Sequence, residues 1–154
     1  MIIGKLGAAG RGCHGERSGM DAAILKTFDE SLVRCQAQAG FLDRFYEIFL
    51  ASSPMVRAKF SNTDFVHQKR ALRMSLHAMA LAAEDEVAGP AKYLESFAER
   101  HSGRSLNIGA EYYDLWLDSL LQTVRETDPE CSAEVLQSWE RVMMVGIGYL
   151  LSRY

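Results

Sequence analysis

The sequence predicts an all-α fold, a single domain of seven or eight helices, and three observations support it. Apolar residues recur at intervals of three and four along most of the chain, which places them on one face of each helix. No segment has the strict alternation of apolar and polar residues that is typical of a half-buried strand. Residues that start and stop helices divide the chain at short intervals.

Residues 1–20 differ from the remainder of the chain in composition. They contain six of the twelve glycines and show no apolar period. We therefore expect residues 1–20 to form a disordered Gly-rich tail and residues 21–154 to form the folded domain. A chain of 154 residues is long enough for one domain with a sizeable core.

Four helices are expected in the first half of the domain. The first two have apolar faces made of Leu25, Phe28, Leu32 and Cys35 and, after Gly40, of Leu42, Phe45, Tyr46 and Phe49. Ser53 and Pro54 are a helix start, a capping hydroxyl before a proline, and this short helix ends at Phe60. Residues 62–64 offer caps for the fourth helix. Its apolar side comprises Phe65, Gln68, Leu72, Ser75, Leu76 and Met79.

Three further helices complete the predicted domain. A short helix is expected from about Pro90 to His101, after Gly89 and Pro90 end the preceding region. The next helix is marked by Tyr113, Trp116, Leu117, Leu120 and Val124. Asp128-Pro129 is predicted to end that helix and to cap the last one. The last helix is expected to bury Val135, Leu136, Trp139, Val142, Met143, Gly146, Ile147 and Leu150.

Charge and composition narrow the possible partners. The net charge of -3 argues against a nucleic-acid binder, which needs a basic face to displace counterions. No apolar run approaches the ~20 residues that span a bilayer, and the N-terminus lacks a secretory signal, so we expect no membrane partner. Three widely spaced cysteines form no disulfide framework, which favours a reducing cytoplasm.

Four segments, taken in order, carry a resemblance to a known family. They are FYEIFLASSPMVRAKF with Tyr46, Pro54 and Phe60, then TDFVHQKRALRMSL, then FAERHSGRSL, and then YYDLWLDSLL with the Trp139 helix. In order and spacing they resemble the bacterial single-domain globins, similar to flavohaemoglobin-type or sensor-type globin domains. The likeness covers residues 21–154 and implies a globin fold whose helices enclose a haem b group, iron protoporphyrin IX.

The resemblance assigns roles to individual residues. His101 is the expected iron ligand, and the Phe97 carbonyl one turn earlier is the expected acceptor for the free N–H of its imidazole. The other expected haem contacts are Phe60, Phe65, Leu72, Phe97 and Tyr113. Arg100 and Arg104 either pair with the haem propionates or are solvated surface residues.

The remaining histidines compete with these assignments. His14 lies in the tail and His77 on the outer side of its helix, so both are expected to be solvated. His67 is the serious competitor, because it could be a second iron ligand. Helical phase favours Gln68 as the residue opposite His101, because Gln68 shares its face with apolar side chains that suit a haem.

Tyr46 and Gln68 are therefore the expected hydrogen-bond pair for a gas ligand, with Leu72 narrowing the ligand space. Bound O₂ has partial superoxide character, so two donors stabilise it by roughly 1.5–3 kcal/mol for each bond to a charged partner. CO gains less from the same donors. The other interpretation of Tyr46 is a core aromatic whose hydroxyl bonds to the backbone.

One departure from the flavohaemoglobin pattern concerns the His101 side. Those globins pair a tyrosine after the iron-binding histidine with a glutamate in the final helix, which makes the imidazole more basic. Tyr112 or Tyr113 could be that tyrosine, but Tyr154 stands at the expected glutamate position. The resemblance therefore puts the strong electron donation used in peroxide or NO chemistry in doubt.

The main functional hypothesis is reversible binding of O₂, or of NO or CO, by a haem globin. An enzymatic alternative is NO dioxygenase activity supported by a separate reductase, because this sequence encodes no electron-transfer domain. Another is a gas-sensing domain that signals to a partner protein. A globin-fold module without haem is the third, and His101 opposite Tyr46 and Gln68 argues against it.

Overall fold

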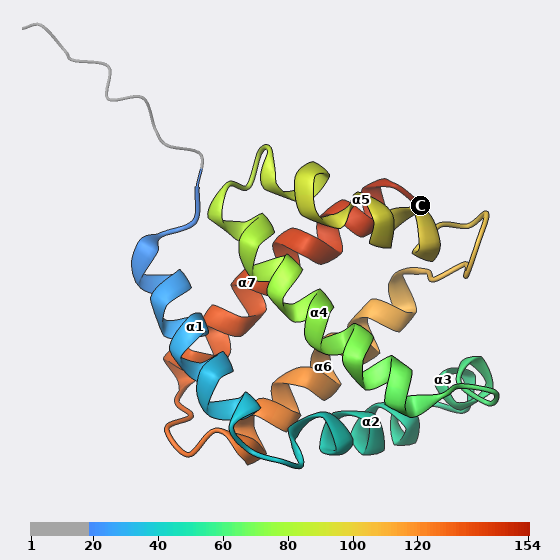
Figure 1. Cartoon of the computed structure of the whole chain (residues 1–154), viewed down its shortest axis with the longest axis horizontal. Coiled ribbons are helices and arrows are strands. Elements are labelled where there is room, and N and C mark those ends of the chain that lie inside the picture. The colour runs from blue at the N-terminus through green and yellow to red at the C-terminus, as the bar shows by residue number, and fades with distance from the viewer. Residues whose placement is uncertain (1–18) are drawn as a thin grey trace, which may run out of the picture.

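The computed structural model describes residues 19–154, and in this range it contains seven α-helices and no strand (Figure 1). The helices are α1 (Ala22–Gln36), α2 (Phe41–Ser52), α3 (Pro54–Lys59), α4 (Phe65–Glu84), α5 (Gly89–His101), α6 (Ala110–Thr127) and α7 (Ala133–Ser152). The all-α prediction is confirmed. The predicted tail lies outside the described residues up to residue 18, including His14, whereas Met20 is described and packs into the core.

The helices pack as a layered bundle around α4 and α7. Helix α4 crosses the centre of the molecule and packs on both α5 and α7 (Figure 1). Helix α1 packs on the other end of α7, and α2 packs on α6. An internal space, described below, lies between these helices. Helix α4 borders it on one side, and the end of α5 and the start of α6 border it on the other side.

The predicted apolar faces form the core. Phe28, Leu32 and Cys35 of α1 are buried, as are Leu72, Leu76 and Met79 of α4. The last helix buries its predicted residues except Leu136, which is partly exposed. The 3.6-residue period therefore identified the inward faces correctly, because each helix needs one continuous apolar stripe against its neighbours.

A buried polar network joins the two ends of the chain far from the internal space. The Arg34 guanidinium donates to both carboxylate oxygens of Asp128, over 2.7 and 2.9 Å. The Ser31 hydroxyl donates to Asp128 over 2.6 Å and accepts from the Trp139 indole over 2.8 Å. Burial alone would raise the pKa of Asp128, but the hydrogen bonds from Arg34 and Ser31 outweigh it, so the pKa is lowered. Every polar group of this cluster has a partner, which is the condition for burying it.

Helix termini follow the sequence signals with one correction. Ser53 caps α3 and Asp64 caps α4 through their side-chain oxygens, as predicted. The prediction that Asp128 caps the last helix is wrong. Ser132 caps α7 by accepting from the Val135 N–H, whereas Asp128 ends α6 and its carboxylate is taken up by Arg34 and Ser31.

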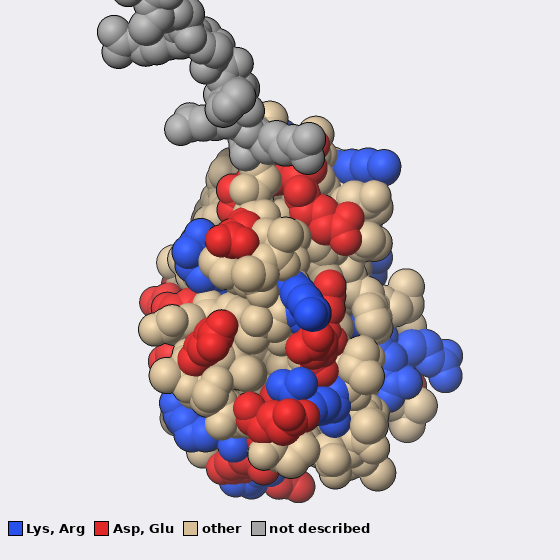
Figure 2. Space-filling model, turned by 90° about the vertical axis from the view of Figure 1, so that its left-hand side faces the viewer, with Lys and Arg blue, Asp and Glu red and all other residues tan. Residues whose placement is uncertain are grey.

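The surface agrees with the composition. Figure 2 shows basic and acidic side chains mixed on the face that carries α1, with no extended area of either sign. In the described part of the chain, no helix is both long enough and apolar enough to cross a membrane.

Gly89 at the start of α5 is required by close helix contact, and Gly89→Ala tests this. A Cβ there would lie 2.3 Å from the carbonyl oxygen of Ala82, a backbone atom that cannot move away cheaply. We expect the free energy of unfolding to fall by about 1–3 kcal/mol in urea denaturation. The matched control is Gly148→Ala in α7, where nothing lies within 4 Å of the new Cβ. It should raise stability by about 0.5–1 kcal/mol, and equal effects of the two variants would contradict this packing.

Candidate functional site

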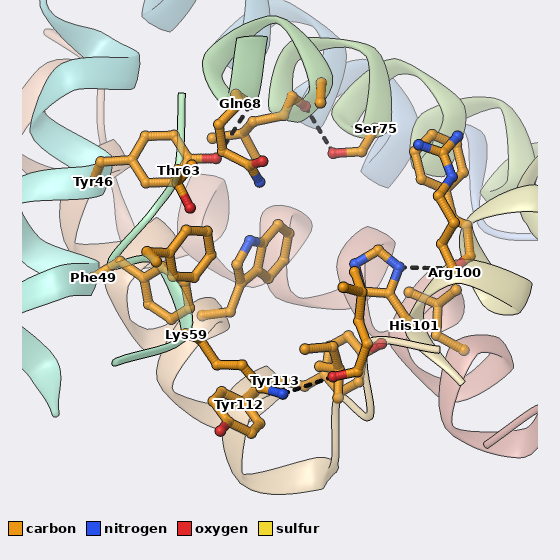
Figure 3. Close-up of a pocket in the computed structure, with 18 of the residues that line it drawn as sticks. Tyr46, Phe49, Lys59, Thr63, Gln68, Ser75, Arg100, His101, Tyr112 and Tyr113 are labelled. Carbon is orange, nitrogen blue, oxygen red and sulfur yellow. Dashed lines mark hydrogen bonds between the residues drawn. The ribbon is translucent and has the colours of Figure 1, made fainter. Parts of the chain in front are cut away.

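The internal space is a cavity of about 320 Å³ that all helices except α1 help to line. Side chains that line it include Phe49, Phe60, Leu72, Met79, Leu94, Phe97, Ile108, Trp116 and Leu150. Polar side chains interrupt this apolar lining, and among them Tyr46 and Gln68 lie on one side and His101 on the other (Figure 3). A mostly apolar cavity with a few converging polar groups is the usual form of a small-molecule or cofactor site.

His101 is the last residue of α5, and its imidazole is held by a local hydrogen bond. Its Nδ1 lies 2.7 Å from the Phe97 carbonyl oxygen, one helical turn earlier. A carbonyl can only accept, so Nδ1 carries the proton and Nε2 keeps its lone pair. Burial lowers the pKa of His101, with a smaller lowering from Arg100. The residue is therefore a neutral imidazole with a free basic nitrogen, which is the form that binds metal.

Tyr46 lies on the opposite side with its hydroxyl next to α4. It is 5% exposed, and burial raises its pKa to about 12, so it is a neutral donor. The hydroxyl donates to the Gln68 backbone carbonyl over 3.3 Å, which is longer than the usual 2.5–3.0 Å for such bonds. The sequence analysis gave two interpretations of Tyr46, a donor to a gas ligand or a core aromatic bonded to the backbone. The contact seen here is a bond to the backbone. Its length indicates a weak bond that a better acceptor could replace.

Gln68 and His67 both line the cavity, but they differ in exposure. Gln68 is half-buried and its side chain points into the cavity in Figure 3, whereas His67 is exposed at the rim. Leu72, one turn beyond Gln68, is buried against the same space. The helical phase inferred from the sequence therefore agrees with the orientation of α4.

The aromatic residues predicted to contact a cofactor divide into two groups. Phe60 and Phe97 line the cavity. Phe65 is not among the lining residues. Its ring packs edge-on against Tyr46 at 5.4 Å and stacks on Phe60 at 6.3 Å between ring centroids. Phe65 thus supports the side chains that form the wall.

Comparison with known proteins gives this geometry a family. The Globin family model matches residues 43–149. A crystal structure of the protein PA3967 from Pseudomonas aeruginosa PAO1, described as structurally highly homologous to a human hemoglobin, is 39% identical with a TM-score of 0.77. The match covers 85% of this chain and 98% of that chain. A comparison with curated protein sequences gave no match.

The chain belongs to the globin family. Membership implies a haem cofactor, and the residues of this globin fit one. His101 offers a neutral imidazole with a free Nε2, and the walls of the cavity are mostly apolar. A buried hydroxyl on the His101 side has no hydrogen-bond partner within residues 19–154. Iron ligation by a histidine whose other nitrogen is held by hydrogen bonding is the usual arrangement.

Among the described residues that line the cavity there is no carboxylate, which the flavohaemoglobin pattern requires on the His101 side. Tyr113 is buried, and its ring centroid lies 6.5 Å from that of His101. Tyr154 is 55% exposed and its hydroxyl bonds to Asn107. Within residues 19–154 no hydrogen-bond partner reaches the Tyr113 hydroxyl. The structure therefore agrees with the sequence in giving no support for an imidazole made strongly basic by a tyrosine–carboxylate pair.

Lys59 and Thr63 line the cavity and were missed by the sequence analysis. Lys59 donates from Nζ to the Leu106 carbonyl over 2.7 Å and lies 5.7 Å from the centre of the Tyr112 ring. The sequence feature that could have identified Lys59 is its position directly before Phe60.

Of the two candidate propionate partners, Arg100 lines this cavity, whereas Arg104 lines a separate surface hollow.

The protonation of His101 can be measured in the haem-free globin. We expect ¹⁵N NMR to show the proton on Nδ1 at neutral pH and a pKa below 6.5. Because folding lowers this pKa, the stability that comes from neutral His101 is complete above pH 6.5 and is lost as the pH falls through the folded value.

His101→Gln removes this part of the pH dependence of unfolding. His77→Gln is the matched control, because His77 is exposed on α4 and does not line the cavity. A proton on Nε2, or an unchanged pH profile in His101→Gln, would contradict the assignment.

Proposed function

We propose that this globin holds haem b through His101 and reversibly binds O₂, or NO or CO, on the side of Tyr46 and Gln68. The observation that carries the proposal is the placement of a neutral, backbone-anchored imidazole and a hydroxyl–amide pair on opposite sides of one apolar cavity. Each side alone has ordinary structural explanations. Together they offer an iron ligand on one side of the cavity and hydrogen-bond donors for a diatomic gas on the other side.

Residues on the two sides of the cavity have different roles. The Phe97 carbonyl fixes the proton of His101 on Nδ1, so Nε2 is always available for iron. A bound haem would supply an iron that can coordinate a diatomic gas, and His101 would hold that iron. Phe60 and Leu72 exclude water from that side and limit the size of the ligand by their bulk.

Tyr46 and Gln68 set the affinity and the choice of gas. The Tyr46 hydroxyl gives up only a long bond of 3.3 Å to the backbone when it turns to a ligand. A hydrogen bond to a charged acceptor is worth roughly 1.5–3 kcal/mol, or about tenfold to more than a hundredfold in affinity. These donors would favour a polar ligand such as O₂ over CO, so we infer tight and slowly released O₂.

Reversible binding is preferred over NO dioxygenase activity and over peroxide chemistry for one structural reason. Those reactions benefit from an imidazole made more basic by a nearby carboxylate, whereas Tyr113 has no such partner among the described residues. Turnover as a dioxygenase also needs an electron donor that returns the iron to the ferrous form. Signalling of gas binding to a partner protein would use the same pocket.

Haem binding is the first test. Titration of the haem-free protein with haemin should give a Soret band at one equivalent, and His101→Gly should retain haem poorly. His77→Gln, which changes an exposed histidine of α4, should bind as well as the wild type. A colourless wild-type protein would refute the proposal. A six-coordinate ferrous spectrum without added gas, abolished by His67→Leu, would assign His67 as a second ligand instead.

The hydrogen-bond pair is tested by gas kinetics. Tyr46→Phe should speed O₂ dissociation by about 10- to 100-fold, because the variant lacks the hydroxyl that stabilises the polar ligand. The rate for CO should change much less in the same variant. Stopped-flow absorption measures both rates, and Gln68→Leu provides the second member of the pair. Equal changes for O₂ and CO would show that Tyr46 acts only through packing.

A further inference from the structure

Among the buried side-chain N and O atoms of residues 19–154, the Tyr113 hydroxyl is the one without a hydrogen-bond partner. Tyr113 lies near the start of α6, is 7% exposed and lines the cavity on the side of His101 (Figure 3). Its hydroxyl oxygen is buried and has no hydrogen-bond partner within residues 19–154. Buried polar groups in proteins are nearly always paired, so an unpaired one needs an explanation.

The other buried hydroxyls of the described chain show how this protein usually satisfies such groups. Ser119 donates to the Leu115 carbonyl over 2.7 Å, and Thr123 donates to the Ser119 carbonyl over 2.7 Å. Ser138 does the same with Val135 over 2.7 Å. These short side chains reach the preceding turn of their own helix, whereas a tyrosine hydroxyl stands too far from its backbone to do so. Tyr113 therefore depends on a partner from outside α6.

Three polar groups around the cavity and on the neighbouring segments bond to other partners. The Nδ1 of His101 bonds to Phe97, and the Nζ of Lys59 bonds to Leu106. Tyr154 bonds to Asn107, outside the cavity. The walls close to the His101 side are apolar, with Leu94 and Leu150 among the lining residues. No hydrogen bond from residues 19–154 reaches the Tyr113 hydroxyl, so a group that fills the cavity can supply the acceptor.

We propose that Tyr113 is a haem-retaining residue, whose hydroxyl stays unpaired in the haem-free protein and gains a hydrogen-bond acceptor when haem fills the cavity. This inference rests on the proposed function. The acceptor is an oxygen that arrives with the cofactor, either of a haem carboxylate or of a water trapped between the haem and α6. Burial raises the pKa of Tyr113 to about 12, so the hydroxyl keeps its proton and acts as a donor at neutral pH.

The proposal predicts opposite effects of one substitution on the two forms of the protein. In the haem-free protein, Tyr113→Phe removes a buried group without a partner and should raise the melting temperature by about 2–4 °C. In the haem-loaded protein, the same change removes a hydrogen bond and should speed haem transfer to an excess of apomyoglobin by about tenfold. Because phenylalanine keeps the ring, a purely structural role for the ring would leave both measurements unchanged.

Tyr93→Phe is the matched control. Tyr93 of α5 is half-buried, does not line the cavity, and its hydroxyl is not among the buried unpaired atoms. We expect both of its measurements to stay close to those of the wild type. Repeating the transfer with haemin dimethyl ester separates the two acceptor sources. The Tyr113→Phe effect disappears with the ester if the acceptor is a haem carboxylate and persists if it is a trapped water.

The outcomes are distinguishable from those of the proposed function. If wild-type protein takes up haem but Tyr113→Phe releases it at the wild-type rate with both forms of haem, the inference is wrong and the haem globin stands. If Tyr113→Phe lowers the melting temperature of the haem-free protein, the hydroxyl already has a partner there and the inference is equally wrong. If the wild type takes up no haem, both the proposed function and the inference fail.

Discussion

The hydrogen bond from the His101 Nδ1 to the Phe97 carbonyl is the interaction on which the site depends. It determines which nitrogen carries the proton and points the other nitrogen into the cavity. Because both residues lie on the last turn of α5, the bond forms as soon as that helix forms. The rest of the fold then has to place the end of α5 opposite α4 and keep the space between them free of side chains. The contacts of α4 with α5 and α7 do this.

Polar groups are treated differently at the two ends of the molecule. At the α1–α7 end, Arg34, Ser31 and Trp139 satisfy Asp128 and its neighbours completely, which stabilises the fold. At the cavity, Tyr46 has a long bond and Tyr113 has no partner in the described chain. Polar groups that are poorly paired in a buried cavity reduce the stability of the empty protein and favour binding of an occupant that pairs them. The structure therefore concentrates its unsatisfied hydrogen-bonding capacity where a ligand is expected.

The two sides of the cavity also differ in chemistry. The side of α4 carries the Tyr46 hydroxyl and the Gln68 side chain, whereas the side of α5 and α6 holds the neutral imidazole of His101. Near that imidazole lies Tyr113, whose hydroxyl has no hydrogen-bond partner among residues 19–154. The two sides therefore offer different groups to an occupant of the cavity.

The sequence by itself determined the helices, their buried faces and the pairing of His101 with Phe97, because all of these depend on residues within a few positions of one another. It also identified the family through the order of four motifs. The tertiary structure decided the contacts between residues far apart in the chain. Among them are the bond of Tyr46 to the Gln68 carbonyl and the packing of Phe65 against Tyr46.

Capping of the last helix was also decided by contacts between residues far apart in the chain. Asp128 is a good local cap, yet its carboxylate is bound by Arg34 and Ser31, which precede it by more than ninety positions. The unpaired hydroxyl of Tyr113 is likewise invisible in the sequence, because the lack of a partner is a property of everything packed around it. Local patterns specify which hydrogen bonds a residue can make, whereas three-dimensional packing decides which of them are made.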